Sequence, residues 1–119
     1  MDEIKENEFV RTKDGIIDKI FKFDEILNEY WCEKGLVIDP ENKIGTHLKD
    51  IVNHSFNIID LIEVGDIVNR QIVVYIEGEG LVVERAEYIF PYILIEEMEI
   101  KEILTHEQYE RNFYRLENN

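Results

Sequence analysis

Turn signals recur about every ten residues along this chain, and they separate short stretches rich in apolar residues. Asp14-Gly15 is a preferred pair for a two-residue hairpin turn, Pro40 follows Asp39 in a favoured turn position, and glycines punctuate residues 77–80. Such spacing leaves room for many short strands and little room for long helices. The sequence therefore predicts a β-rich α+β fold, either a small antiparallel barrel or a bent sheet, with one or two short helices.

The hairpin around Asp14-Gly15 is expected to join strands at residues 8–13 and 16–23. Pro91 interrupts the most apolar window of the chain, residues 88–95, and argues against one continuous central strand there. Residues 25–34 leave two alternatives open, a short helix or a strand that ends at Gly35. Further strands are expected at residues 36–38, 71–76, 81–86, 96–104 and 113–116.

Two short helices are expected. Thr46 is a suitable N-cap for residues 46–53, whose apolar side chains recur at helical spacing. Residues 105–108 have a capping-box pattern, Thr-His-Glu-Gln, which predicts a helix that carries Tyr109. Both helices would be insertions in a fold dominated by strands.

Negative charge is the main compositional feature. The chain has 27 Asp and Glu against 13 Lys and Arg, a formal net charge of −14 on 119 residues, yet 45% of it is hydrophobic. That apolar fraction is ordinary for a folded protein, so residues 1–119 are expected to form a single domain. A polyanionic surface repels nucleic acids and anionic lipids, so the expected partner is a basic protein, with no direct contact to nucleic acid or membrane.

The sequence contains no catalytic motif, which predicts a protein that is not an enzyme and needs no cofactor or metal. Cys32 is flanked by Glu29 and Glu33, whereas a reactive thiol requires a cationic environment, so it is expected to be a small buried residue. The three histidines have no Cys partner or metalloprotease motif nearby and are expected to be surface or capping residues. The chain begins without an apolar leader and contains no apolar run of membrane-spanning length, which predicts a cytoplasmic protein.

The densest carboxylate cluster is Glu96-Glu97-Glu99. In a strand, Glu97 and Glu99 would project from one face and Glu96 from the other. Nothing in this spacing indicates the apolar environment that a catalytic carboxyl needs, so a solvated face and a partner-binding face are the two alternatives. The candidate partner contacts are six glutamates: Glu77, Glu79, Glu96, Glu97, Glu99 and Glu102.

Three segments carry a resemblance: residues 9–15, FVRTKDG; residues 54–66, HSFNIIDLIEVGD; and residues 103–110, ILTHEQYE. They resemble small acidic proteins encoded by phages and prophages of low-GC Gram-positive bacteria. In those proteins a segment of the form HS-NIIDLIEVGD-V precedes an ending of the form I-TKEQ-F. His106 and Tyr109 stand where that ending usually has Lys and Phe. The resemblance spans most of the chain, is weakest in the middle, and brings no assigned activity, so no residue inherits a role.

A phage origin implies an interaction protein, because short acidic phage proteins often resemble anti-defence inhibitors. Some of those mimic the charge of nucleic acid and occupy the basic channel of a host nuclease or a CRISPR effector, which fast electrostatic steering would favour. Two alternatives remain open. One is a nucleotide-binding sponge that uses Arg70, Arg85, Arg111 or Arg115, and the other is a phage accessory protein without inhibitory activity. The aromatic stripe Tyr88, Phe90 and Tyr92 is expected to be part of the core or a self-association surface, which leaves a homodimer open.

Overall fold

The computed structural model describes residues 3–41, 45–84 and 92–111, and its contacts fall into two compact units, residues 1–61 and 62–119. Each unit is built around one sheet, and the described residues contain a single short α-helix besides three 3-10 turns. This confirms the β-rich α+β class with bent sheets. The single domain expected for residues 1–119 stays a prediction.

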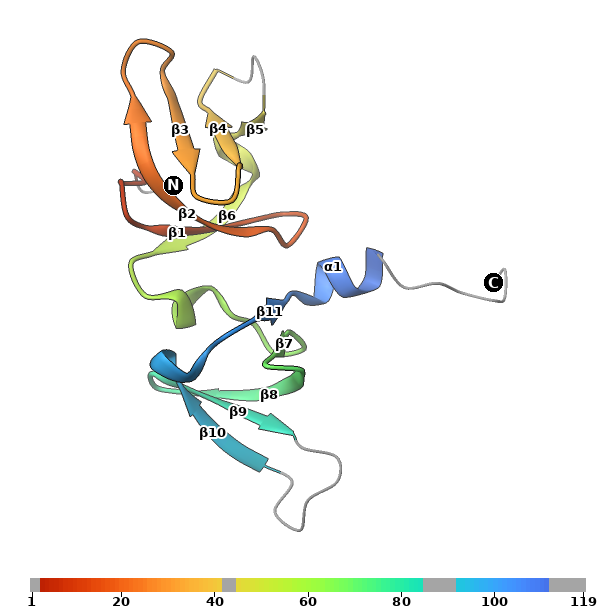
Figure 1. Cartoon of the computed structure of the whole chain (residues 1–119). Helices are drawn as coiled ribbons and strands as arrows, with labels where there is room; N and C mark the ends of the chain where they lie inside the picture. Colours follow the sequence, from red (N-terminus) through yellow and green to blue (C-terminus); the bar gives the residue numbers. More distant parts are fainter. Residues whose placement is uncertain (1–2, 42–44, 85–91, 112–119) are drawn as a thin grey trace, which may run out of the picture. The chain divides into compact units, whose positions relative to one another are not determined.

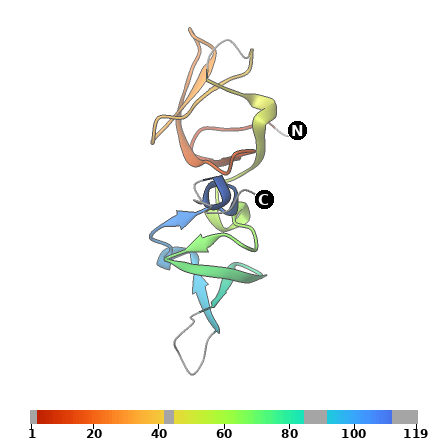
Figure 2. The same cartoon turned by 90° about the vertical axis from the view of Figure 1, so that its right-hand side faces the viewer.

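The first unit has a six-stranded sheet in the order β5-β4-β3-β2-β1-β6, which curls strongly (Figures 1 and 2). All neighbours are antiparallel except β4 and β5, which are parallel. Irregularities in the pairing at Arg11/Thr12 and at Ile20/Lys22 allow the curling, because a bulge bends the strand that contains it. The strands are β1 Phe9–Thr12, β2 Ile17–Asp24, β3 Glu29–Cys32, β4 Val37–Asp39, β5 Thr46–His47 and β6 Ile51–Ser55.

The core of the first unit includes a cluster of six buried side chains, Ile4, Val10, Ile20, Cys32, Ile38 and Ile51. Cys32 is a buried free thiol, as predicted. Burial raises the pKa of Cys32 to about 12, and the charges of Asp18 and Glu33 add to the rise. The residue therefore remains a thiol at neutral pH and acts as part of the apolar packing.

The N-terminal hairpin is confirmed, with Val10 opposite Asp18 and Arg11 opposite Ile17. Its loop has three residues, however, and not the two predicted. The amide of Thr12 donates to the carbonyl of Ile16, and Gly15 sits at φ +82° with its amide donating to Thr12. A turn followed by a left-handed residue gives this longer loop, and glycine adopts that conformation without strain.

The structure of the first unit decides two predictions, those for residues 25–34 and 46–53. Residues 25–34 contain the strand β3 and no helix, so the strand alternative is the correct one. The helix expected at residues 46–53 is wrong, since only the 3-10 turn η1, Leu48–Asp50, separates β5 from β6. His47 caps this turn in place of Thr46, by accepting a hydrogen bond from the Lys49 amide at its Nδ1 (2.9 Å). Pairing of β6 with β1 holds the following residues extended. A second 3-10 turn, η2 Ile58–Leu61, ends the unit.

The second unit has a five-stranded antiparallel sheet in the order β10-β9-β8-β7-β11. Its buried side chains include Val68, Val73, Leu81, Val83 and Ile95. Strands were correctly predicted within residues 71–76 and 81–86, of which 85–86 lie outside the described residues. The strands are β7 Ile67–Val68, β8 Gln71–Glu77, β9 Gly80–Glu84, β10 Tyr92–Glu96 and β11 Ile103–Leu104.

The continuous strand expected at residues 96–104 is wrong. The chain leaves the sheet after Glu96, forms the 3-10 turn η3 Glu97–Glu99, and returns only at β11. The amide of Glu96 donates to Glu99 Oε1 at 3.1 Å, which closes the turn. The alternating apolar residues that suggested one strand therefore belong partly to the turn η3 and partly to the short edge strand β11.

The helix predicted from the capping-box pattern is confirmed as α1 His106–Arg111. Thr105 precedes it and its Oγ1 accepts a hydrogen bond from the Gln108 amide at 3.3 Å, the interaction expected of an N-cap. No helix among the described residues is long and apolar enough to cross a membrane. The strand expected at residues 113–116 lies outside the described residues, as does Pro91.

Candidate functional site

Strand register brings glutamates of β8 and β10 to one end of the second unit's sheet. Glu77 of β8 lies opposite Gly80 of β9, and Gly80 lies opposite Glu96 of β10, so the three residues form one row across the sheet. Glu79 lies in the two-residue connection between β8 and β9, where Gly78 takes φ +57°. This row brings Glu77 and Glu96, which are 19 positions apart in the sequence, to the same end of the sheet on the two strands that flank β9 (Figure 1 shows the strand order).

The turn η3 extends the row, because it begins directly after Glu96. Glu97 and Glu99 are both exposed, and they belong to a turn instead of projecting from one face of a strand as expected. We call Glu77, Glu79, Glu96, Glu97 and Glu99 the acidic end. All five side chains are exposed, so the acidic end can meet a cationic partner without first rearranging.

Glu102, the sixth candidate, has a different environment. Its Oε1 accepts a hydrogen bond from Arg70 Nε at 2.9 Å, and both side chains are largely exposed. Arg70 directly precedes β8, whereas Glu77 ends that strand, so Glu102 is paired near the start of β8 and away from the row. The Arg70 charge offsets that of Glu102, which leaves five of the six predicted glutamates at the acidic end.

Asn69 fixes where Glu99 and Glu102 lie, a role that sequence reasoning missed. Its amide side chain donates to the carbonyl of Glu99 at 2.8 Å, and its Oδ1 accepts from the backbone amides of Lys101 and Glu102 at 2.8 and 3.2 Å. Asn69 and Arg70 form the tight turn between β7 and β8, with φ of +52° and +68°. Asparagine adopts this conformation more readily than most residues, and the Asn-Arg pair between two apolar runs was the available sequence signal.

Replacing Asn69 by alanine is expected to lower the free energy of unfolding by about 2 kcal/mol, through lost hydrogen bonds and a strained positive φ. Asn69→Gly keeps the turn conformation and loses only the side-chain hydrogen bonds, so about half that loss is expected. Amide hydrogen exchange of Val68 and Val73 in the three proteins measures the difference. Equal protection in all three would show that Asn69 does not hold the segment.

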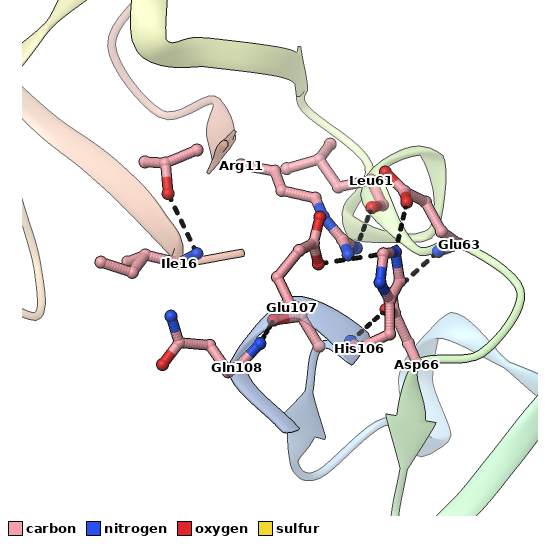
Figure 3. Close-up of polar contacts among 10 residues, drawn as sticks. Arg11, Ile16, Leu61, Glu63, Asp66, His106, Glu107 and Gln108 are labelled. Carbon is pink, nitrogen blue, oxygen red and sulfur yellow. Dashed lines mark hydrogen bonds and ion pairs between the residues drawn. The ribbon is translucent and has the colours of Figure 1, made fainter. Parts of the chain in front are cut away.

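A second polar cluster of the same unit surrounds the buried carboxylate of Asp66 (Figure 3). Its Oδ2 accepts a hydrogen bond from the Glu63 amide at 2.8 Å, and its Oδ1 accepts from the His106 amide at 2.9 Å. Asp66 thereby joins the turn before β7 to the first residue of α1. The ring Nε2 of His106 in turn lies 2.8 Å from Glu63 Oε1 and 3.5 Å from Glu107 Oε1.

Glu63, His106 and Glu107 offer three ligand atoms within 4.8 Å of one another, a set that could hold a metal ion. The distance between His106 and Glu63 is also that of an ordinary charge-assisted hydrogen bond. The hydrogen bond to Glu63 raises the pKa of His106 above its usual value. Partial burial opposes this rise, and the charges of Glu107 and Asp66 add to it.

The raised pKa of His106 predicts a pH-dependent stability of the second unit. The protonated imidazole stabilises the fold, so this contribution is fully present below the unfolded pKa of about 6.5 and is lost as the pH rises through the higher folded value. NMR titration of the His106 ring should give a midpoint above 6.5 in the wild type and a lower one in Glu63→Gln. An unchanged midpoint in that variant would rule out Glu63 as the cause.

The other two histidines are in the first unit and do not share a helix face. His47 is the cap described above, and His54 Nδ1 lies 2.7 Å from Glu8 Oε2. His54 of β6 is also directly opposite Val10 in the register with β1, which brings it next to Glu8. His47 has the predicted capping role, whereas His54 is neither a cap nor a surface residue, since its side chain is only 15% exposed and lies against the buried Glu8.

A cavity of about 310 Å³ lies in the first unit, lined by residues of the N-terminal hairpin loop and by residues 45, 46 and 50. Its charged lining consists of Lys13, Asp14 and Asp50, and Lys13 Nζ lies 3.2 Å from Asp50 Oδ1. The ion pair lowers the pKa of Asp50, since Lys13 donates a hydrogen bond to the carboxylate. With two carboxylates for one ammonium, this cavity does not favour a nucleotide phosphate.

Neither Arg70 nor Arg111, two of the four arginines proposed for a nucleotide site, is among the residues that line this cavity. Arg70 is the partner of Glu102, Arg111 ends α1, and Arg85 and Arg115 lie outside the described residues.

Comparison with protein families, with curated proteins and with solved structures finds no match to this chain.

Proposed function

We propose that this chain is a non-enzymatic, phage-encoded interaction protein that acts in the host bacterial cytoplasm. Its acidic end binds a basic nucleic-acid-binding surface of a host nuclease or CRISPR effector and thereby inhibits it. The observation that carries the proposal is the row formed by Glu77, Gly80 and Glu96, which brings carboxylates of β8 and β10 to the end of the sheet where η3 begins.

The physical basis is charge replacement. Carboxylates held by a sheet and a closed turn can substitute for phosphates against Lys and Arg, and electrostatic steering accelerates the encounter. The carboxylates of Glu77, Glu79 and Glu97 make no hydrogen bond or ion pair with the residues that the structure describes, so their charge is available to a partner. The net charge of −14 adds a long-range attraction for any basic protein.

Affinity capture from a bacterial lysate tests the proposal. The immobilised chain is washed at low and then at high salt, beside a Glu77→Lys, Glu79→Lys, Glu97→Lys variant. We expect a basic nucleic-acid enzyme that is retained at low salt by the wild type alone, released at high salt, and inhibited by the purified wild type. A retained protein that binds both baits equally and keeps its nucleic-acid affinity would contradict the proposal.

A further inference from the structure

The acidic end borders an exposed apolar surface on the same side of the sheet. The register of β8, β9 and β10 gives five rows, and alternate rows point to opposite faces. The rows Val73-Val83-Ile93 and Ile76-Leu81-Ile95 contain the buried apolar side chains, so the remaining three rows face outward, with Gly80 covered by Leu94. Those outward rows are Ile72-Glu84-Tyr92, Tyr75-Val82-Leu94 and Glu77-Gly80-Glu96.

We call Ile72, Tyr75, Val82, Tyr92 and Leu94 the apolar face. Tyr75 is 58% exposed, Tyr92 60% and Leu94 52%, which is unusual for large side chains gathered on one side of a small sheet. The Leu94 side chain lies over Gly80 of the neighbouring strand. A Cβ atom at position 80 would be only 2.6 Å from Leu94 Cδ1, so a larger residue would displace it. Glycine at position 80 therefore lets the apolar face continue up to the acidic end.

Carboxylates flank the apolar face at both ends, and the three outward rows contain no Lys or Arg. Glu84 lies in the row at one end, and Glu77 and Glu96 lie in the row at the other. A strand rises about 3.3 Å per residue, so the two acidic rows are roughly 13 Å apart. This arrangement complements an extended segment with basic side chains four residues apart and an apolar side chain midway between them.

We propose that the apolar face and its flanking glutamates together form the docking surface, and that its occupant is a basic protein segment with a central apolar or aromatic anchor. The proposal rests on the proposed function and specifies its partner further. The glutamates attract and orient the segment, while the apolar face supplies the part of the affinity that salt does not screen. A pure mimic of nucleic acid would need the glutamates alone.

Two seven-residue peptides of equal charge test this inference by NMR titration of the full-length chain. Each has two lysines on either side of a three-residue centre, which is Ser-Trp-Ser in one peptide and Ser-Ser-Ser in the other. At high salt we expect the tryptophan peptide to bind about tenfold more tightly and to shift the amides of Tyr75, Val82 and Leu94. Leu94→Ser should abolish this advantage, whereas Ile26→Ser, an exposed apolar residue of the first unit, should preserve it.

The outcomes separate this inference from the proposed function. Equal affinity of both peptides, with shifts confined to the acidic end, would overturn the inference and leave the proposed function standing. Absence of binding by both peptides at low salt would overturn both. Shifts of the apolar face that depend on protein concentration without peptide would identify a second copy of the chain as the occupant, and would likewise overturn the inference.

Discussion

Asp66→Ala is expected to lower the free energy of unfolding of the second unit by about 3 kcal/mol. The Asp66 carboxylate is fully buried and accepts hydrogen bonds from the amides of Glu63 and His106. Alanine would leave both donors without their acceptor, and a buried donor without a partner costs about 1–3 kcal/mol. The same change would detach the start of α1 from the turn that precedes β7.

Asp66→Asn is the matched control, because the amide retains one acceptor oxygen and nearly the same volume. We expect Asp66→Asn to lower the free energy of unfolding by less than Asp66→Ala does. Amide exchange of Val73 and Val83 reports on the second unit, and exchange of Val10 and Ile38 reports on the first. A loss below about 0.5 kcal/mol in Asp66→Ala would mean that this carboxylate does not hold the unit together.

The triple variant Glu77→Lys, Glu79→Lys, Glu97→Lys is expected to bind the captured enzyme at least about a hundredfold more weakly. An exposed ion pair contributes up to about 1 kcal/mol, and reversal also adds repulsion, so three sites account for that factor. Because these three side chains are exposed and the closing hydrogen bond of η3 uses Glu96 and Glu99, the fold should be unaffected. Isothermal titration of both proteins at low salt measures the effect.

Net charge alone could produce a similar loss, so the control changes the charge equally at another place. The variant Glu3→Lys, Glu25→Lys, Glu33→Lys reverses three exposed glutamates of the first unit. It should weaken binding by less than about tenfold, through the reduced long-range attraction only. Equal losses of affinity in the two variants would show that binding depends on the total charge of the protein and not on the acidic end.

Local patterns predicted the elements whose structure depends on neighbouring residues. The Asp14-Gly15 hairpin and the cap at Thr105 are where the sequence placed them, because turn and capping preferences act over a few residues. The prediction did not extend to loop length, since the left-handed Gly15 adds one residue to the turn. The prediction of a helix at residues 46–53 is wrong because the pairing of β6 with β1 overrides the helix propensity of so short a segment.

The composition of the candidate site was predictable, but its geometry was not. Charge density alone indicated the six glutamates, and five of them do lie together at the acidic end. The row that joins Glu77 to Glu96 depends on the register of β8, β9 and β10, which an irregularity between Val73 and Tyr75 shifts. No periodicity reveals such a shift, and the same register exposes Tyr75 and Leu94, which sequence reasoning did not connect with the glutamates.

The proposed function requires that the acidic end be the part of this chain that meets cationic surfaces. An NMR titration of the full-length protein with an oligo-arginine peptide, at low and at high salt, measures where a cation binds. We expect the largest shifts at residues 77–80 and 96–99, lost at high salt and lost in the Glu77→Lys, Glu79→Lys, Glu97→Lys variant. Shifts spread evenly over the exposed carboxylates of both units, or unchanged in that variant, would contradict the claim.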